Sequence, residues 1–233
     1  MGVTLELLRT FPVLKNLPQD LLTQLADGSV LRRCARRSVV LTAGKKEQFV
    51  CFLFEGRLQG VDFTIDGREV GLNFIEPGEF CGELGLFDQG PQPEHVIALA
   101  PSSVVFVPMD SLREVMLRSP EVVNALGAKL ASRVRQMTFQ RSLLGLPSIS
   151  QRVCCQLWML VPEKDKQASP DSQIANPPTH LEIAIMLNIS RETVTRVFQT
   201  LQNRQIVKRD GSAKLLIRNV QILKRYAEGT EEI

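Results

Sequence analysis

The stretch Ile189-Ser-Arg-Glu-Thr-Val-Thr-Arg-Val197 decides the fold of the C-terminal part of this 233-residue chain. Ser190 can accept hydrogen bonds from the first free amide groups of a helix, so the stretch predicts a helix over 190–203. Apolar residues at helical spacing bury one side of that helix and leave a polar side exposed. The buried side comprises Val194, Val197, Phe198 and Leu201, and the polar side comprises Arg191, Glu192, Thr195 and Arg196.

The polar side carries groups that recognise base edges in the major groove of DNA. Arginine can donate two parallel hydrogen bonds to guanine, and glutamate can accept one from cytosine. The pattern therefore predicts a DNA-binding helix. One alternative stays open, in which Glu192 and Arg196, four residues apart, form an ordinary ion pair on a solvated helix.

The flanking segments complete a DNA-binding module. Thr179-His-Leu-Glu182 is a capping box, which predicts a first helix that ends near Leu187. Asn188 and Ile189 form the short turn, and the small Ala184 allows the two helices to approach closely. Beyond the second helix, two apolar runs within 206–217 surround Asp210-Gly211, which is a hairpin signal. These elements predict a winged helix-turn-helix.

Charge separates this module from the rest of the chain. Residues 180–225 hold nine Lys and Arg against three Asp and Glu, whereas residues 1–149 hold sixteen of each sign. The net charge of +3 therefore conceals a basic module joined to a neutral one. A basic module is what contact with DNA phosphates requires.

Composition excludes several classes of protein. With 44% hydrophobic and 23% charged residues the chain is globular and long enough for two domains. No apolar run approaches a membrane span and no signal-peptide pattern occurs, so we expect a cytoplasmic protein without a membrane partner. The five cysteines lack zinc-ligand or redox spacing, so we expect no metal site. No catalytic motif occurs, and we expect no enzyme.

The N-terminal part has the rhythm of a small β-barrel. Residues 30–108 are short β-rich runs separated by glycines, with a hairpin turn expected at Asp66-Gly67. From Pro120 the pattern becomes helical and predicts one long helix to about Leu144. The chain is therefore expected to be an α+β protein with a jelly-roll barrel (1–119), a long dimerisation helix (120–145) and a winged helix-turn-helix domain (146–233).

The long helix carries an apolar stripe at three- and four-residue steps. Such a stripe suits pairing with the same helix of a second copy, because a dimer would bring two DNA-binding helices to successive major grooves. Ordinary core packing is the alternative. The stripe comprises Leu126, Leu130, Val134, Met137 and Leu144, with Arg141 also on it.

Two motifs and the domain order resemble the CRP/FNR family, the cyclic AMP receptor protein and its relatives. The motifs are Phe80-Cys-Gly-Glu-Leu-Gly-Leu-Phe-Asp-Gln-Gly90 and the run Ser190-Arg-Glu-Thr-Val-x-Arg196. The resemblance covers nearly the whole chain. It implies a homodimeric bacterial transcription regulator that binds palindromic double-stranded DNA, contacts RNA polymerase and responds to a signal in its barrel. It also implies a cyclic nucleotide-binding barrel.

The resemblance assigns DNA-binding roles to matching residues. Arg191, Glu192 and Arg196 occupy the family's base-contacting positions, Ser190 caps the helix, and Thr179 contacts phosphate. Thr195 shares their polar face. The set resembles the cyclic AMP receptor subtype, which implies GTGA-like half-sites.

The effector pocket matches the family less completely. Gly82-Glu83-Leu84 is present, but the following loop, Gly90-Pro-Gln-Pro-Glu-His95, lacks the arginine that neutralises the cyclic phosphate in relatives. Glu94 would instead repel a phosphate. Met137 and Thr138 align with the positions that contact adenine. The effector-binding candidates are Gly82, Glu83, Leu84, Glu94, His95, Met137 and Thr138.

Four effector alternatives stay open. Cyclic di-GMP or another nucleotide is favoured over ordinary cyclic AMP binding. The others are no small ligand, cyclic AMP in an altered mode, and haem or redox sensing, for which only Cys81 and the nearby His95 speak. The arginines of 32–37 could bind an anionic effector or form a solvated strand edge. A regulatory or interaction module that shares the barrel is the alternative to a DNA-binding regulator.

Overall fold

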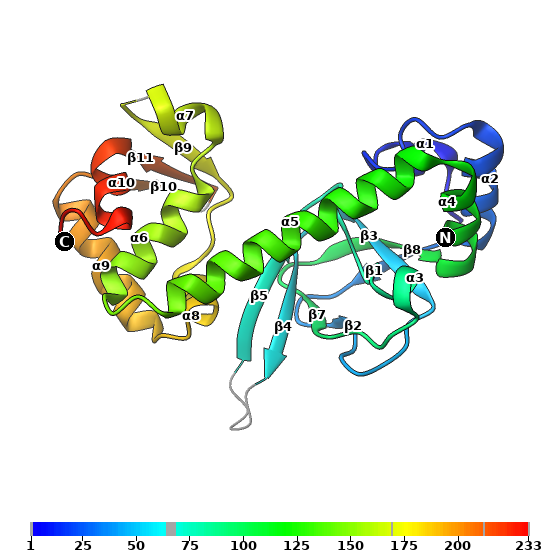
Figure 1. Ribbon diagram of the computed structural model, residues 1–233, viewed down its shortest axis with the longest axis horizontal. Coiled ribbons are helices and arrows are strands. Elements are labelled where there is room, and N and C mark those ends of the chain that lie inside the picture. Colours follow the sequence, from blue (N-terminus) through cyan, green and yellow to red (C-terminus); the bar gives the residue numbers. More distant parts are fainter. Residues whose placement is uncertain (1, 64–68, 169, 212, 233) are drawn as a thin grey trace. The chain divides into compact units, whose positions relative to one another are not determined.

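The computed structural model describes residues 2–63, 69–168, 170–211 and 213–232. The chain divides into two compact units, Met1–Val134 and Arg135–Ile233, and each has its own hydrophobic core (Figure 1). The boundary falls inside the long helix. The turn expected at Asp66-Gly67 lies outside the described residues, and the three-part division by function stays a proposal.

The first unit is a β-barrel of two antiparallel four-stranded sheets, ordered β1-β8-β3-β6 and β2-β7-β4-β5. This arrangement confirms the jelly-roll expectation. Its strands are β1 (Val30–Cys34), β2 (Val39–Leu41), β3 (Phe49–Glu55), β4 (Leu58–Phe63), β5 (Glu69–Ile75), β6 (Phe80–Cys81), β7 (His95–Ala98) and β8 (Ser102–Pro108). Its helices are α1 (Leu5–Arg9), α2 (Gln19–Gly28), α3 (Gly85–Asp88), α4 (Met109–Arg118) and the first part of α5 (Pro120–Leu144).

Strand β3 shows why the barrel sequence is apolar without a clean alternation. Val50 and Phe52 pack into a core shared with the helices, and Cys51 and Leu53 fill the barrel interior. All four side chains are fully buried. Because successive side chains of a strand point to opposite faces, a strand covered on both faces needs an unbroken apolar run.

The second unit packs helices around a three-stranded sheet ordered β10-β11-β9. Its elements after α5 are α6 (Ile149–Leu160), α7 (Glu163–Ala168), β9 (Ser172–Ala175), α8 (His180–Leu187), α9 (Arg191–Asn203), β10 (Val207–Asp210), β11 (Lys214–Ile217) and α10 (Val220–Glu228). Helices α8 and α9 form the predicted helix-turn-helix. Asn188 turns the chain between them in the left-handed conformation, with φ 52° and ψ 49°.

The wing prediction is confirmed, and one loop prediction is wrong. β10 and β11 pair antiparallel around Gly211, whose φ is +65°. The segment 162–178, expected as a polar loop, contains α7 and β9, and β9 pairs with β11. Ser172 and Ile174 are buried while Gln173 between them is exposed. A two-step alternation over four residues is too short to stand out among prolines and serines.

The apolar stripe of α5 requires one correction. Leu126 is fully buried in the core of its own unit, so it does not face a second copy. The barrel core takes Leu126 and Val122 because they lie on the side of α5 that meets it. The exposed apolar residues of α5 are Val123 at 37%, Val134 at 63%, Met137 at 58% and Leu144 at 46%, with Leu130 half-buried and Gly127 exposed between them.

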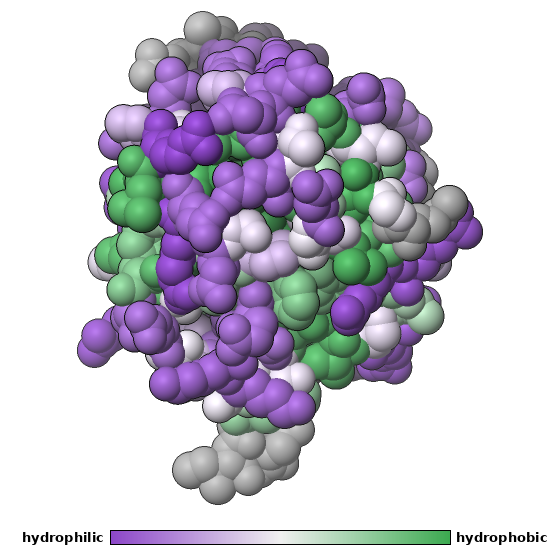
Figure 2. Space-filling model, turned by 90° about the vertical axis from the view of Figure 1, so that its right-hand side faces the viewer, coloured by the Kyte–Doolittle hydropathy of each residue, from purple (hydrophilic) through white to green (hydrophobic). Residues whose placement is uncertain are grey.

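The surface outside this stripe is mostly polar. Figure 2 shows one face, largely hydrophilic with hydrophobic residues between the polar ones. Among the helices that the structure describes, none has the length and hydrophobicity to cross a membrane.

Candidate nucleic-acid interface and effector pocket

Helix α9, the recognition helix, separates its buried and polar sides as predicted. Val194 and Leu201 are fully buried, and Phe198 is 1% exposed. Arg191, Glu192 and Arg196 are exposed on the other side. The apolar side anchors the helix in the core of the second unit, so the polar side is held toward solvent.

Two hydroxyl groups hold the ends of the helix-turn-helix in place. Ser190 Oγ accepts a hydrogen bond from Thr193 N at 3.2 Å and lies 2.8 Å from Thr193 Oγ1. Thr179 Oγ1 accepts from Glu182 N at 3.2 Å, and Thr179 N donates to Glu182 Oε2 at 2.6 Å, which completes the predicted capping box. Thr179 and Ser190 are both exposed.

Thr195 is engaged within the protein. Its hydroxyl donates to Arg191 O at 2.9 Å and lies 3.0 Å from His180 Nδ1. The His180 ring also contacts the Phe198 ring, with centroids 4.4 Å apart. His180 therefore joins α8 to α9. Burial lowers the pKa of His180, and the nearby Arg209 and Arg191 lower it further.

The barrel pocket is built around the turn after β6. Gly82 adopts φ +84°, and a Cβ there would lie 3.0 Å from Leu41 Cδ1, so both conformation and space favour glycine. Its carbonyl accepts a hydrogen bond from the buried Gln92 Nε2 at 3.3 Å. This turn places Glu83 inside the unit with no exposed surface.

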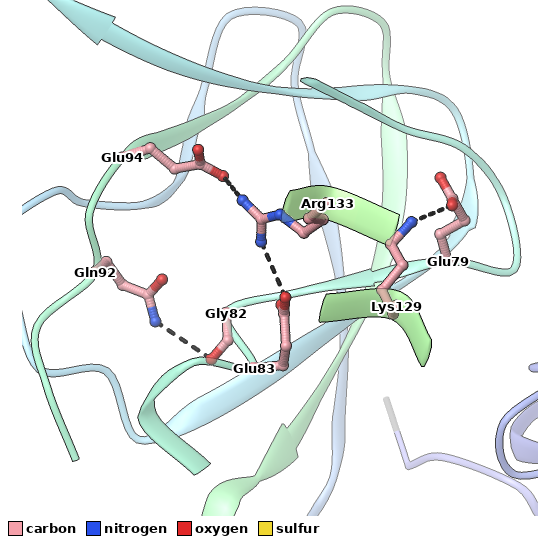
Figure 3. A network of polar contacts seen from close by, with 7 residues as sticks. All are labelled: Glu79, Gly82, Glu83, Gln92, Glu94, Lys129 and Arg133. Carbon is pink, nitrogen blue, oxygen red and sulfur yellow. Dashed lines mark hydrogen bonds and ion pairs between the residues drawn. The ribbon is translucent and has the colours of Figure 1, made fainter. Parts of the chain in front are cut away.

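Arg133 of α5 is the cation of this pocket (Figure 3). Its Nη1 lies 2.9 Å from Glu83 Oε1, and its Nη2 lies 2.6 Å from Glu94 Oε1. The side chains of Arg133, Glu83 and Glu94 are 15%, 0% and 8% exposed. One guanidinium group therefore bridges two buried carboxylates. One turn earlier on α5, Lys129 pairs with Glu79.

The two carboxylates are not held equally well. Burial raises the pKa of Glu94, and Arg133 offsets only part of that effect. Within the described chain, Glu83 Oε2 and Asn73 Oδ1 are buried without a hydrogen-bond partner. Gly60 leaves room for Glu94, because a Cβ there would lie 2.8 Å from Glu94 Oε1.

The remaining effector candidates are spread over both units. Leu84 is half-buried beside Glu83. His95 Nδ1 accepts a hydrogen bond from Ala43 N at 3.4 Å, and its ring edge meets Phe63. Met137 and Thr138 are exposed residues of the second unit. The structure thus brings together Gly82, Glu83 and Glu94.

The haem alternative loses its main support. Cys81 is 1% exposed in the barrel core, where it pairs across the strands with Cys51. A thiol buried in that way is not available to a haem iron. Among the described residues, no group of three His, Cys, Asp or Glu could hold a metal ion. The arginines of 32–37 are exposed, and the Arg32 guanidinium lies over the Phe106 ring.

Sequence reasoning missed Arg133, Gln92 and His180. Arg133 lies 50 residues from Glu83 and 39 from Glu94, and no local pattern links them. The available signal was chemical: two pocket carboxylates without a loop arginine require a cation from elsewhere. His180 occurs inside the capping box, where a histidine has no special meaning.

Comparisons with known proteins match both units. A cyclic nucleotide-binding domain model matches residues 31–119, and a Crp-like helix-turn-helix domain model matches residues 151–226. The cAMP-activated global transcriptional regulator CRP of Pasteurella multocida is 27% identical over 176 residues, which cover 75% of this chain and 84% of the relative. The corresponding regulator Vfr of Pseudomonas aeruginosa is 28% identical over 189 residues, covering 79% and 88%. Among solved structures, the c-di-GMP responsive global regulator CLP of Xanthomonas campestris has the same fold, with a TM-score of 0.65 and 21% identity over 86% of this chain and 99% of that one.

Proposed function

The chain belongs to the CRP/FNR family of DNA-binding transcription regulators, and we propose that it is a homodimer that recognises a palindromic DNA site with GTGA-like half-sites. One observation carries the proposal. The recognition helix exposes Arg191, Glu192 and Arg196 on the side opposite its buried residues, inside a basic module.

Each exposed side chain has a defined role in this proposal. Arg191 and Arg196 donate to base edges, Glu192 accepts from cytosine, and the exposed Thr179 contacts phosphate. Ser190 and Thr195 act within the protein by capping α9 and by linking it to His180.

The dimer would form along α5. Val134, Met137 and Leu144 are exposed apolar residues at three- and seven-residue steps, as in a two-helix seam. A symmetric dimer has two recognition helices, which suits a palindromic site. RNA polymerase is the further proposed partner, and the cytoplasm is the proposed location.

The proposed effector is a cyclic nucleotide, with cyclic di-GMP or another nucleotide preferred to cyclic AMP bound in the usual way. Glu83 offers a buried carboxylate for hydroxyl groups, and Arg133 offers a cation for a phosphate. Glu94, already bonded to Arg133, opposes an ordinary cyclic AMP contact.

Fluorescence anisotropy with a palindromic duplex would test DNA recognition. We expect Arg196→Ala and Glu192→Ala each to weaken binding by roughly 1 to 3 kcal/mol and to reduce discrimination at the contacted base pair, because they remove base contacts. Lys164→Ala is the matched control, since it removes one exposed charge elsewhere in the same unit.

Normal affinity and normal base discrimination in Arg196→Ala would contradict the assignment of the recognition helix. Failure of the unaltered chain to bind any duplex, with nucleotide binding intact, would favour a regulatory or interaction module instead.

A further inference from the structure

The bridge formed by Arg133 joins three segments that are distant in the sequence. Glu83 follows β6, Glu94 precedes β7, and Arg133 belongs to α5. Figure 3 shows the guanidinium group between the two carboxylates, with one nitrogen directed at each. Arg133 uses separate nitrogens for the two contacts, so loss of one carboxylate need not break the other contact.

Charge in this cluster is unbalanced. Two carboxylates share one guanidinium group, and Glu83 Oε2 has no hydrogen-bond partner among the described residues. The charged form of Glu94 is costly, because burial raises its pKa despite the neighbouring Arg133. Asp62 and Glu83 also face Glu94 and act in the same direction. Glu94 is therefore the carboxylate that is easier to remove from Arg133.

We propose that Glu94 is a tethered competitor for the effector: it occupies the anion position at Arg133, and the phosphate of a cyclic nucleotide binds there by displacing it. The proposal rests on the proposed function of the barrel as a nucleotide sensor. It names Arg133 as the group that neutralises the phosphate and Glu94 as the residue that limits which nucleotides bind.

The chemistry of the two anions supports the exchange. A phosphate offers a guanidinium group oxygens in the same geometry as a carboxylate, and charge-assisted contacts of both kinds are strong. The loop 90–95 contains no other cation, so a phosphate that enters this cluster has Arg133 as its partner there. Nucleotide binding must then overcome the existing Glu94 contact, and the net affinity is reduced by that amount.

Calorimetry with the full chain would test the exchange, using cyclic AMP, cyclic GMP and cyclic di-GMP as separate probes. Glu94→Gln keeps the size of the side chain and removes its charge, so we expect at least one probe to bind at least tenfold more tightly than to the unaltered chain. Arg133→Gln should abolish that binding. The double variant should behave like Arg133→Gln, because the gain requires the freed guanidinium group.

Two controls separate this effect from general disturbance of the fold. Lys129→Gln breaks the neighbouring ion pair with Glu79 on the same helix and should leave nucleotide affinity unchanged. Glu94→Asp keeps the negative charge and should not show the gain. Circular dichroism would establish that each variant is folded.

The proposal is overturned if Glu94→Gln binds none of the three nucleotides more tightly than the unaltered chain, or if the gain persists in the double variant. These measurements involve no DNA. A negative result therefore leaves the DNA-binding proposal intact, whereas a failure to bind DNA would leave the calorimetric comparison valid.

Discussion

His180 joins the two helices of the helix-turn-helix through one hydrogen bond to Thr195 and one ring contact with Phe198. Both contacts lie directly beneath the exposed face of α9. Protonation of His180 would place a positive charge near Arg191 and Arg209, which already lower its pKa together with burial. The position of the recognition helix therefore depends on a neutral imidazole group.

His180 predicts a pH-dependent stability of the second unit. Its pKa is lowered in the folded chain, so on acidification the unfolded chain binds the proton first. The free energy of unfolding should therefore fall as pH decreases from about 7.5 through the ordinary histidine pKa of about 6.5. We expect His180→Gln to reduce this pH dependence.

Urea titrations followed by tryptophan fluorescence would check this expectation. Trp158, the only tryptophan, lies in α6 of the second unit, and the other histidine, His95, lies in the first unit. The same pH dependence in the variant and in the unaltered chain would exclude His180 as its source.

At the scale of the element, α5 combines two kinds of apolar surface. Leu126 is fully buried in the barrel core, whereas Val134, two turns later, is 63% exposed. Both are apolar residues on one continuous helix, and they fall on one stripe by spacing alone. Their surroundings differ, so substitutions at the two positions should have different effects.

We expect Val134→Glu to weaken self-association at least tenfold, because it introduces charge into an apolar seam, and to leave the stability of the chain nearly unchanged. Leu126→Ala should instead cost about 2 to 5 kcal/mol of unfolding free energy. Sedimentation velocity over a range of concentrations and thermal unfolding would measure the two effects. Unchanged association in Val134→Glu would count against the dimer seam.

At the scale of the whole molecule, charge divides the chain by function. Residues 180–225 carry a threefold excess of basic over acidic residues, and residues 1–149 carry equal numbers. DNA binding through such a module releases counterions from the phosphates, so it depends strongly on salt.

For the palindromic duplex we expect affinity to fall by about 10³-fold or more between about 50 and 200 mM salt, the range for six or more phosphate contacts. Val134→Glu should show a shallower slope, because one copy contacts fewer phosphates. Anisotropy titrations at four salt concentrations would give both slopes. A nearly flat dependence for the unaltered chain would contradict binding through the basic module.

Local sequence patterns determined the elements of the DNA-binding unit. The capping box, the N-cap Ser190 and the apolar spacing of 190–203 are interactions between residues a few positions apart, so they can be recognised without the fold. The helix 120–144 and the wing hairpin follow for the same reason. The short strand β9 does not, because it is specified by its pairing with β11 some 40 residues later.

The pocket was decided only by the tertiary structure. The sequence showed Glu83 and Glu94 and the absence of a loop arginine, but it did not show that Arg133 reaches both carboxylates from a helix 39 to 50 residues away. Likewise, spacing placed Leu126 on the exposed stripe, whereas the barrel core buries it. The physical reason is the same in both cases. Periodicity and capping arise from neighbours along the chain, while burial and charge compensation arise from residues that only folding brings together.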